Sequence, residues 1–433
     1  MTFSGNVRAV LGALFGANRH GREDGAAKES AQIEELRALD LQNPDFISNP
    51  YPYLAQLQDR DPVHRSINGA WVLTRYDDVH AALADRRLGN APSPYAVVNE
   101  RNRTRFTCAD VANNIIPFLD RPEHTRPRKI IARAFATVLK ASGPDLQGMA
   151  HSALLALDRS GDALHDLATP YSLGAISSIL GIPSEDAPRL KRWSQSFFYL
   201  FSIIPSQEIR QQLDHDLDCF RTYLAQLVRE RRHRPRADLI SALLDSAIDG
   251  EGLSDAELVD HCMLLFSDGV ENVDSGIASA LYALLTNPEQ MTLLQSRPDL
   301  VSAAVEECLR FEAPGQFIGR VVQEDLELHG IRLQKHSPVL LMIGAANRDP
   351  RRFESPHRFD ITRSPNDHLS FGRGAHACIG AQLVKAEMEA VLHALLQSGM
   401  TLALADPNVH WEARLGHRWL AGLPVTVSGS TLQ

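Results

Sequence analysis

The sequence predicts a mainly α-helical protein with a minor β subdomain, folded as one large helical domain. Apolar residues recur at helical spacing through most of the chain after residue 119, whereas strand-like alternation is confined to short segments. No Gly/Ser tract, proline-rich spacer or internal repeat divides the 433 residues, and 44% of them are hydrophobic. We therefore expect a flexible N-terminal extension over residues 1–35, which lack an apolar period, and a single domain over residues 36–433.

Composition argues against several classes of protein. The net charge of −9 gives no reason to expect a nucleic-acid partner. The apolar run at residues 9–15 is far shorter than the ~20 residues of a membrane span, and it lacks a convincing signal-peptide cleavage site. The five cysteines include no C-x-x-C pair, which argues against a disulfide framework or a structural zinc site. These features are typical of a soluble, cytoplasmic protein.

The β component is predicted from short alternating segments. Val63–Arg65 and Ala70–Thr74 read as two strands joined by a turn at Asn68–Gly69. Residues 88–116 show no regular period. Further strand-like segments are expected at residues 326–328, 337–343, 401–404 and 424–427.

Helical periodicity accounts for most of the remaining chain. Candidate helices are a charged helix within residues 119–139, then 148–159, 164–180, 186–200, 209–232, 237–247 and 299–311. The longest runs from Ser254 to Thr286, because Ser254 and Glu257 fit a capping box and Asn287–Pro288 ends the pattern. A last strong helix begins at about Ile379.

Cys378 lies in a glycine-bearing loop immediately before that last helix. The exposed amides and positive end of a helix N-terminus favour a thiolate over a thiol. Glycines let a backbone approach a flat, bulky group or adopt angles that other residues avoid, and three are present: Gly372, Gly374 and Gly380. A thiolate in such a loop is a suitable axial ligand for heme iron, although a lone cysteine after a glycine turn can also be a plain buried residue.

The complete pattern F-G-x-G-x-H-x-C-x-G spans Phe371 to Gly380. With it, the sequence resembles the cytochrome P450 family of heme–thiolate monooxygenases, particularly soluble bacterial members, over roughly residues 40–430. The resemblance implies a cytochrome P450-like fold, with residues 36–433 as the heme–thiolate catalytic domain. It also implies a heme b cofactor, with Cys378 as the ligand of the iron and Phe371, Gly372 and Gly380 in the surrounding loop.

Two other groups of residues match the family. Glu307–Arg310 reads E-x-x-R, and Arg358 resembles the third member of the buried charge cluster that the family builds behind the heme. His124 and Arg128 lie one helical turn apart, where two cations on one face need an anion opposite them unless the helix end is simply exposed. In the family these two positions bind the heme propionates, and Arg320 and His376 match two further propionate-binding positions: all four are candidate heme-binding residues.

The predicted helix Ser254–Thr286 resembles the family helix that crosses the oxygen-binding face of the heme. Gly269 has no Cβ, so a diatomic ligand on the iron could come close. Polar residues one turn apart could line a water-holding groove, or could simply face solvent from a core helix: Asp268, Glu271, Asn272 and Ser275.

The family pattern in this helix is approximately A/G-G-x-D/E-T, whereas this chain reads Asp268-Gly-Val-Glu271-Asn272. The acid is present, but asparagine replaces the threonine. An asparagine amide can donate a hydrogen bond and fix a water molecule, yet it is a poor proton relay. We expect Asn272 to orient dioxygen or water, while Glu271, Asp268 or a substrate hydroxyl supplies the proton path.

The resemblance implies a monomeric monooxygenase that uses dioxygen and two electrons from a ferredoxin-type partner with a separate reductase. It would hydroxylate, epoxidise or oxidatively couple a small hydrophobic molecule, free or tethered to a carrier protein, in bacterial secondary metabolism. Four basic residues could help to dock the ferredoxin or could be solvated helix charges: Arg126, Arg128, Lys129 and Arg133. The alternatives are peroxide-driven or other non-monooxygenase heme–thiolate catalysis, and a heme-free homologue that recruits a partner.

Overall fold

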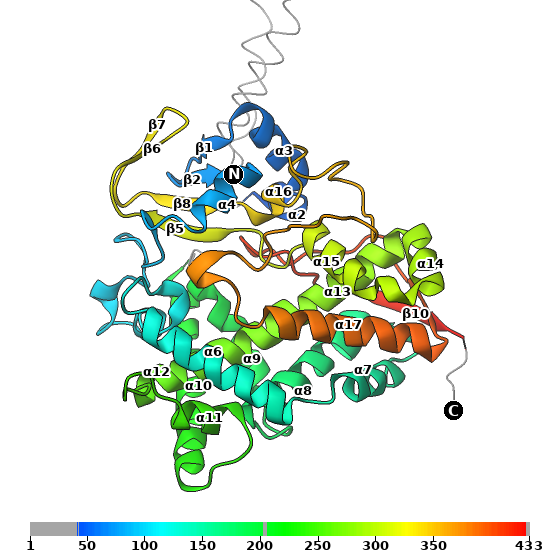
Figure 1. The fold of residues 1–433 in the computed structure, drawn as a ribbon, viewed down its shortest axis with the longest axis horizontal. Helices are drawn as coiled ribbons and strands as arrows, with labels where there is room; N and C mark the ends of the chain where they lie inside the picture. Colours follow the sequence, from blue (N-terminus) through cyan, green and yellow to red (C-terminus); the bar gives the residue numbers. More distant parts are fainter. Residues whose placement is uncertain (1–40, 42, 202–205, 430–433) are drawn as a thin grey trace, which may run out of the picture.

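The computed structural model describes residues 41, 43–201 and 206–429, and the predicted N-terminal extension over residues 1–35 lies outside them. Helices dominate the described part of the chain, and a smaller group of strands lies along one side of the helical body (Figure 1). The prediction of a mainly helical fold with a minor β part is confirmed. No described helix has the length and apolar composition of a membrane span.

The largest sheet has five strands in the order β1-β2-β8-β5-β3. These are β1 (Val63–Arg65), β2 (Trp71–Leu73), β3 (Leu88–Gly89), β5 (Ile318–Val322) and β8 (Pro338–Leu341). β1 and β2 form the predicted hairpin, in which Val63 lies opposite Leu73. Four helices lie near this sheet in Figure 1: α2 (Pro44–Ser48), α3 (Tyr51–Arg60), α4 (Tyr76–Ala82) and α16 (Ile343–Ala346).

Two smaller sheets complete the β component. β10 (Pro424–Ser428) pairs in antiparallel fashion with β4 (Ser160–Asp162) and β9 (Thr401–Leu404), so the C-terminal strand is held between distant parts of the chain. β6 (Leu326–Leu328) and β7 (Ile331–Leu333) form a separate hairpin. β6, β8, β9 and β10 lie where the sequence predicts strands.

The helical body begins with α5 (Thr107–Ala112), α6 (Thr125–Ser142), α7 (Leu146–Leu155), α8 (Thr169–Leu180), α9 (Ala187–Phe197), α10 (Gln207–His233) and α11 (Leu239–Asp245). It continues with α12 (Asp255–Ser267), α13 (Val273–Thr286), α14 (Pro288–Ser296), α15 (Val301–Phe311) and α17 (Ala381–Ser398). α5 was not predicted, because its six residues lie in a segment without a period. α14 was missed because Pro288, which ends α13, also occupies the first turn of the next helix.

Short 3-10 and π-helical segments lie beside or between the α-helices. The 3-10 segments are η1 (Glu100–Asn102), η2 (Ile116–Phe118), η4 (Phe198–Phe201), η6 (Pro298–Leu300) and η7 (Gly374–His376). Two are π-helical: η3 (Ala163–Ala168) before α8, and η5 (Asp268–Asn272) between α12 and α13.

The predicted long helix is therefore three segments, α12, η5 and α13. Its start is confirmed: the Ser254 hydroxyl accepts from the Glu257 amide at 3.3 Å, and the Ser254 amide donates to the Glu257 carboxylate at 2.8 Å. The continuous α-helix is wrong at its centre, where the polar residues adopt a π-turn. Such turns occur frequently at functional sites, because they shift the side chains that follow around the helix axis.

Candidate active site

A cavity of about 680 Å³ lies between η5 and the loop that precedes α17. Its walls are mainly apolar and include aromatic side chains from η2 and η4, such as Phe118, Phe198 and Phe201. Cys378 lines the cavity from the loop before α17, whereas Asp268 and Asn272 line it from η5. A sulfur atom and a polar pair thus share one apolar chamber.

The Cys378 loop owes its shape to glycine. Gly372 and Gly374 have φ values of 63° and 74°, in a region that other residues rarely adopt. The loop is fastened where the Cys378 amide donates to the Phe371 carbonyl at 2.9 Å. Phe371, Gly372 and Gly380 all line the cavity beside Cys378, as predicted for residues around a bound group.

Two opposing effects act on the Cys378 thiol. Burial, followed by the Asp268 carboxylate across the cavity, raises its pKa to about 11. The backbone amides of Gly380 and Ala381, together with Arg128, act in the opposite direction. The amides at the helix start thus act in the predicted direction, and burial opposes them. Coordination to a metal cation removes the proton from a thiol outright, so a bound metal ion would stabilise the thiolate.

Basic side chains gather at one edge of the cavity. Arg128, Arg320 and His376 line it, whereas His124 lies behind His376, with ring centroids 3.9 Å apart. Arg128 donates to the carbonyl of Ala377, next to Cys378. The structure thus brings together the four residues that the sequence predicted as a set, from α6, β5 and η7.

Burial, and then repulsion between the positive charges of these basic groups, lowers the pKa of the histidines among them. Burial and then the charge of Arg128 lower the pKa of His124, and burial followed by His124 and Arg320 lowers the pKa of His376 to about 3. Burial lowers the pKa of Arg320 to about 10. The His124 Nε2 atom is buried without a hydrogen-bond partner among the described residues. A ligand carrying carboxylates would satisfy this cluster.

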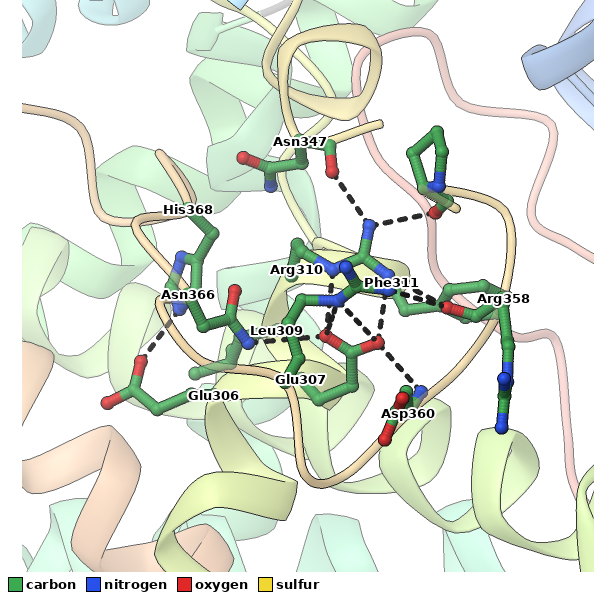
Figure 2. A network of polar contacts seen from close by, with 12 residues as sticks. Glu306, Glu307, Leu309, Arg310, Phe311, Asn347, Arg358, Asp360, Asn366 and His368 are labelled. Atoms are coloured by element: carbon green, nitrogen blue, oxygen red, sulfur yellow. Dashed lines mark hydrogen bonds and ion pairs between the residues drawn. The ribbon is translucent and has the colours of Figure 1, made fainter. Parts of the chain in front are cut away.

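A buried ion network supports the other side of the Cys378 loop (Figure 2). Both Glu307 and Arg310 are fully buried, and the Arg310 guanidinium donates to the two Glu307 oxygens at 2.7 and 2.8 Å. Arg310 also donates to the backbone carbonyls of Asn347 and Pro356, at 2.8 and 2.9 Å. The predicted E-x-x-R pair therefore ties α15 to the long loop that leads to Cys378.

The third member of this network is Arg363, and the prediction of Arg358 is wrong. Arg363 Nε donates to the Glu307 carboxylate at 3.1 and 3.3 Å. Arg358 contributes only its carbonyl oxygen, which accepts from Arg310 and Arg363, and its exposed side chain points away from Glu307 in Figure 2. Both arginines lie in a loop without a period, so spacing could not distinguish them.

Gly269 allows close helix packing, and its predicted role toward a diatomic ligand stays a prediction. A Cβ on Gly269 would lie 2.7 Å from Cγ1 of Ile176 on α8. The missing side chain therefore lets η5 pack against α8. Gly269 does line the cavity, but through its backbone.

Glu271 lies outside the cavity, contrary to the predicted groove. Its carboxylate accepts from Lys191 Nζ at 2.7 Å and from the Ser194 hydroxyl, both on α9. Lys191 also pairs with Asp274 at 3.0 Å. Burial raises the pKa of the Glu271 carboxyl, and the Lys191 cation opposes that rise. Ser275 is buried and donates to Asp274 at 3.3 Å, so it too is absent from the cavity wall.

Asp268 and Asn272 are the polar residues of η5 that face the cavity. Asn272 Nδ2 donates to Asp268 Oδ1 at 3.4 Å across one turn. Burial raises the pKa of the Asp268 carboxyl to about 7, so this group exchanges a proton near neutral pH. Of the two acids that the sequence offered for a proton path, Asp268 lies beside Asn272 in the cavity and Glu271 does not.

Comparison with known proteins agrees with this geometry. A family model described as cytochrome P450 matches residues 189–398. A biotin biosynthesis cytochrome P450 from Bacillus subtilis (strain 168) is 33% identical over 389 residues, covering 88% of this chain and 97% of that protein. Mycinamicin IV hydroxylase/epoxidase from Micromonospora griseorubida is 33% identical over 382 residues, covering 86% of this chain and 94% of that protein.

The chain belongs to the cytochrome P450 family. The solved structure of P450BioI, in complex with a hexadec-9Z-enoic acid ligated acyl carrier protein, matches with a TM-score of 0.82 and 33% identity over 89% of this chain and 99% of that one. The structure of CalO2 matches with a TM-score of 0.83 and 32% identity over 91% and 99% of the two chains. The protein is a cytochrome P450 monooxygenase, and its family binds heme.

The residues of this cytochrome P450 fit a heme group. Cys378 offers a sulfur ligand from one wall, and the basic cluster at the cavity edge needs carboxylates, which heme propionates supply. The apolar walls suit a flat hydrophobic macrocycle. Cys378, His376, His124, Arg128 and Arg320 would hold it.

By resemblance to the family, the sequence predicts a substrate-facing wall that includes residues around 90–105, Phe197–Phe201, Phe266, Val270, Gly315–Ile318 and Trp419–Leu420. The structure agrees with this prediction in part. Residues 90–93, Phe198, Phe201, Gly315 and Ile318 line the cavity as expected. Other expected residues do not: Phe197, Phe266, Val270, Trp419 and Leu420 are buried elsewhere in the core. Sequence reasoning missed the aromatic and polar lining from η2 and the loop before β10, which includes Phe118 and His417. Their positions follow from tertiary packing and not from a local pattern.

Proposed function

We propose that this cytochrome P450 inserts oxygen into, or oxidatively couples, a small hydrophobic molecule in bacterial secondary metabolism. It would use heme b, dioxygen and two electrons from a ferredoxin-type protein with a separate reductase. The observation that carries the proposal is the chamber of about 680 Å³, with the Cys378 sulfur on one wall and the Asp268–Asn272 pair on another. Residues 36–433 would act as one catalytic domain.

The bound heme would supply the activation of dioxygen, and the chain would position the substrate and supply protons. The apolar walls exclude water and bind a hydrophobic skeleton. Asp268 exchanges a proton near neutral pH, and Asn272 keeps its carboxyl group oriented through the side-chain amide. Asn272 replaces the family threonine, so Asp268 takes over the proton-exchanging role that an amide cannot perform. Glu271, turned toward Lys191, would act only behind this pair.

Redox docking has partial support from the surface of α6. Lys129 and Arg133 are exposed and could meet an acidic ferredoxin. Arg126 is already paired with Glu257 at 2.6 Å, and Arg128 points inward to the Cys378 loop. The docking surface would therefore use fewer of these residues than the sequence suggested.

A carrier-tethered substrate is a second possibility for the same active site. P450BioI, solved with a fatty-acid-ligated acyl carrier protein, is 33% identical over 89% of this chain. The curated relatives also include a polyketide biosynthesis cytochrome P450 from Bacillus subtilis (strain 168). Both make carrier-bound acyl groups reasonable ligands to test beside free metabolites.

Titration of the purified ferric holoenzyme with hydrophobic metabolites, free and carrier-bound, tests this proposal. A shift of the heme absorbance from low spin to high spin is the expected response to a ligand near the iron. Cys378→Ala should abolish the thiolate heme spectrum. A wild-type protein that takes up no heme during expression would overturn the proposal.

The role of Asn272 is tested by the yield of product per electron consumed. Asn272→Ala should divert electrons into peroxide, because the Asp268 carboxyl loses its orienting amide. Asn272→Thr should keep a larger share in product, because a hydroxyl can both donate and accept. Equal yields in the wild type and both variants would contradict this role.

A further inference from the structure

The cavity wall formed by η5 presents acceptor oxygens that lack matching donors. Asn272 Oδ1 is buried and has no hydrogen-bond partner among the described residues. Asp268 receives only the long hydrogen bond of 3.4 Å from Asn272 Nδ2, and no ion pair to it occurs in the described part of the chain. Both residues line the cavity. A ligand that donates hydrogen bonds would therefore complement this wall.

The other carboxylates of this helix show the contrast. Glu271 and Asp274 face away from the cavity and share the Lys191 ammonium, at 2.7 and 3.0 Å. Their side chains are 5% and 4% exposed, and the one Lys191 cation lies within hydrogen-bond distance of both carboxylates. Among the described residues Asp268 has no such cation, although a carboxylate that faces an apolar cavity without a partner is costly. A cation from outside the chain would complete the arrangement.

Asp268 and Asn272 are also the two departures of this helix from the pattern A/G-G-x-D/E-T, at its first and last positions. They are one turn apart and in contact, so the two substitutions form one structural unit. A small residue at position 268 would leave the wall without a carboxylate. The pair therefore gives this cavity a polar feature that the general family pattern does not contain.

We propose that the substrate of this enzyme carries a protonated amine, which the Asp268 carboxylate and the Asn272 amide oxygen bind. An ammonium group brings a positive charge and several N–H donors, and so satisfies both oxygens at once. A hydroxyl group brings one donor and no charge, and a carboxylate is repelled. This inference rests on the proposed function only in placing the substrate in this cavity, and it narrows the substrate class to hydrophobic amines.

The remaining walls define the rest of such a molecule. Phe118 and Phe201 stack with ring centroids 5.0 Å apart, and Phe198 lies beside Phe201 at 5.8 Å. All three line the cavity. A hydrophobic or aromatic skeleton would therefore contact these rings while its amine is held at η5.

The test is equilibrium binding to the ferric holoenzyme of three probes with one skeleton: decylamine, decanol and decanoic acid. The wild type should bind decylamine roughly 10-fold or more tightly than decanol, and decanoic acid most weakly. Asp268→Asn keeps the size of the side chain and should remove most of the preference for the amine, with little change for decanol. Asn272→Ala removes one acceptor and should reduce the preference less.

Asp274→Asn is the matched control, because it removes a carboxylate of the same helix from outside the cavity. It should leave the amine preference unchanged. A wild type that binds decanol as well as decylamine would overturn the proposal. So would an amine preference that survives both Asp268→Asn and Asn272→Ala, since the amine would then bind the iron directly.

These outcomes are separable from failure of the proposed function. If only the amine inference fails, the protein still shows a heme–thiolate spectrum and a spin-state response to decanol. If the proposed function fails, the heme spectrum itself is absent. Should Asp268→Asn not retain heme, Asn272→Ala and the wild-type probe series still decide the inference.

Discussion

The buried network around Glu307 allows a direct test of which arginine supports the Cys378 loop. Arg363→Ala removes two contacts to the Glu307 carboxylate, at 3.1 and 3.3 Å, and a bond of 2.7 Å to the Glu354 carbonyl. Hydrogen bonds to charged groups contribute roughly 1.5–3 kcal/mol each, and they are not additive in one network. We expect a loss of roughly 2–4 kcal/mol in the free energy of unfolding, from a total of about 5–15 kcal/mol.

Arg358→Ala is the matched control, because it removes an arginine side chain from the same loop. Its carbonyl remains available to Arg310 and Arg363, so the cost should stay under about 0.5 kcal/mol. Glu307→Ala is the upper bound: it leaves the buried Arg310 and the partly buried Arg363 without their carboxylate and should cost at least about 3–5 kcal/mol, with loss of heme incorporation.

Urea unfolding of the three purified variants, followed by far-ultraviolet circular dichroism, measures these differences. The heme absorbance per protein after purification gives a second readout. Equal losses for Arg358→Ala and Arg363→Ala would refute the assignment. A normal heme content and stability in Glu307→Ala would refute the role of the whole network.

Two further predictions concern packing and pH. Gly269→Ala should destabilise the protein by roughly 1–3 kcal/mol, because its methyl group would overpack against Ile176. In the double variant with Ile176→Ala, part of this loss should be recovered. Thermal unfolding of the single and double variants checks this, and additive losses would contradict it. Burial lowers the pKa of His261 to about 4, and the neutral ring accepts a hydrogen bond from the Ile116 amide at 3.2 Å. Between pH 6.5 and about 4 His261 is protonated in the unfolded state but neutral in the folded state. The free energy of unfolding should therefore decrease by up to about 3 kcal/mol as the pH is lowered through this range. His261→Gln should lack that contribution in urea unfolding series, and parallel pH curves for the two proteins would disprove it.

Much of the fold and the Cys378 side of the cavity could be predicted, because those features depend on residues that are close in sequence. The capping box at Ser254, the hairpin of β1 and β2, and the Cys378 loop are all encoded within about ten residues of sequence. The basic cluster was predicted as a set only through resemblance to the family. Its mutual contacts come from α6, β5 and η7, which no local pattern brings together.

The errors arose where side-chain direction depends on distant partners. Glu271 and Asp268 are three residues apart, and helical spacing alone cannot say which of them faces the cavity. Lys191 and Ser194, on another helix, draw Glu271 away, while the π-turn changes the phase of the side chains. The close approach of Gly269 to Ile176, on another helix, was likewise not predictable from spacing.

The ion pair between Lys191 and Glu271 connects η5, which carries Asp268 and Asn272, to the helix that leads into the aromatic residues of η4. Lys191 belongs to α9, which continues directly into η4, where Phe198 and Phe201 line the cavity. A bulky substrate that displaces η4 outward would therefore bend α9 or lengthen the ion pair between Lys191 and Glu271. In this chain the volume available to a guest and the electrostatic environment of the reactive wall are mechanically coupled. Enlarging the chamber by engineering would therefore alter the charge balance beside it, unless Lys191 is kept in place.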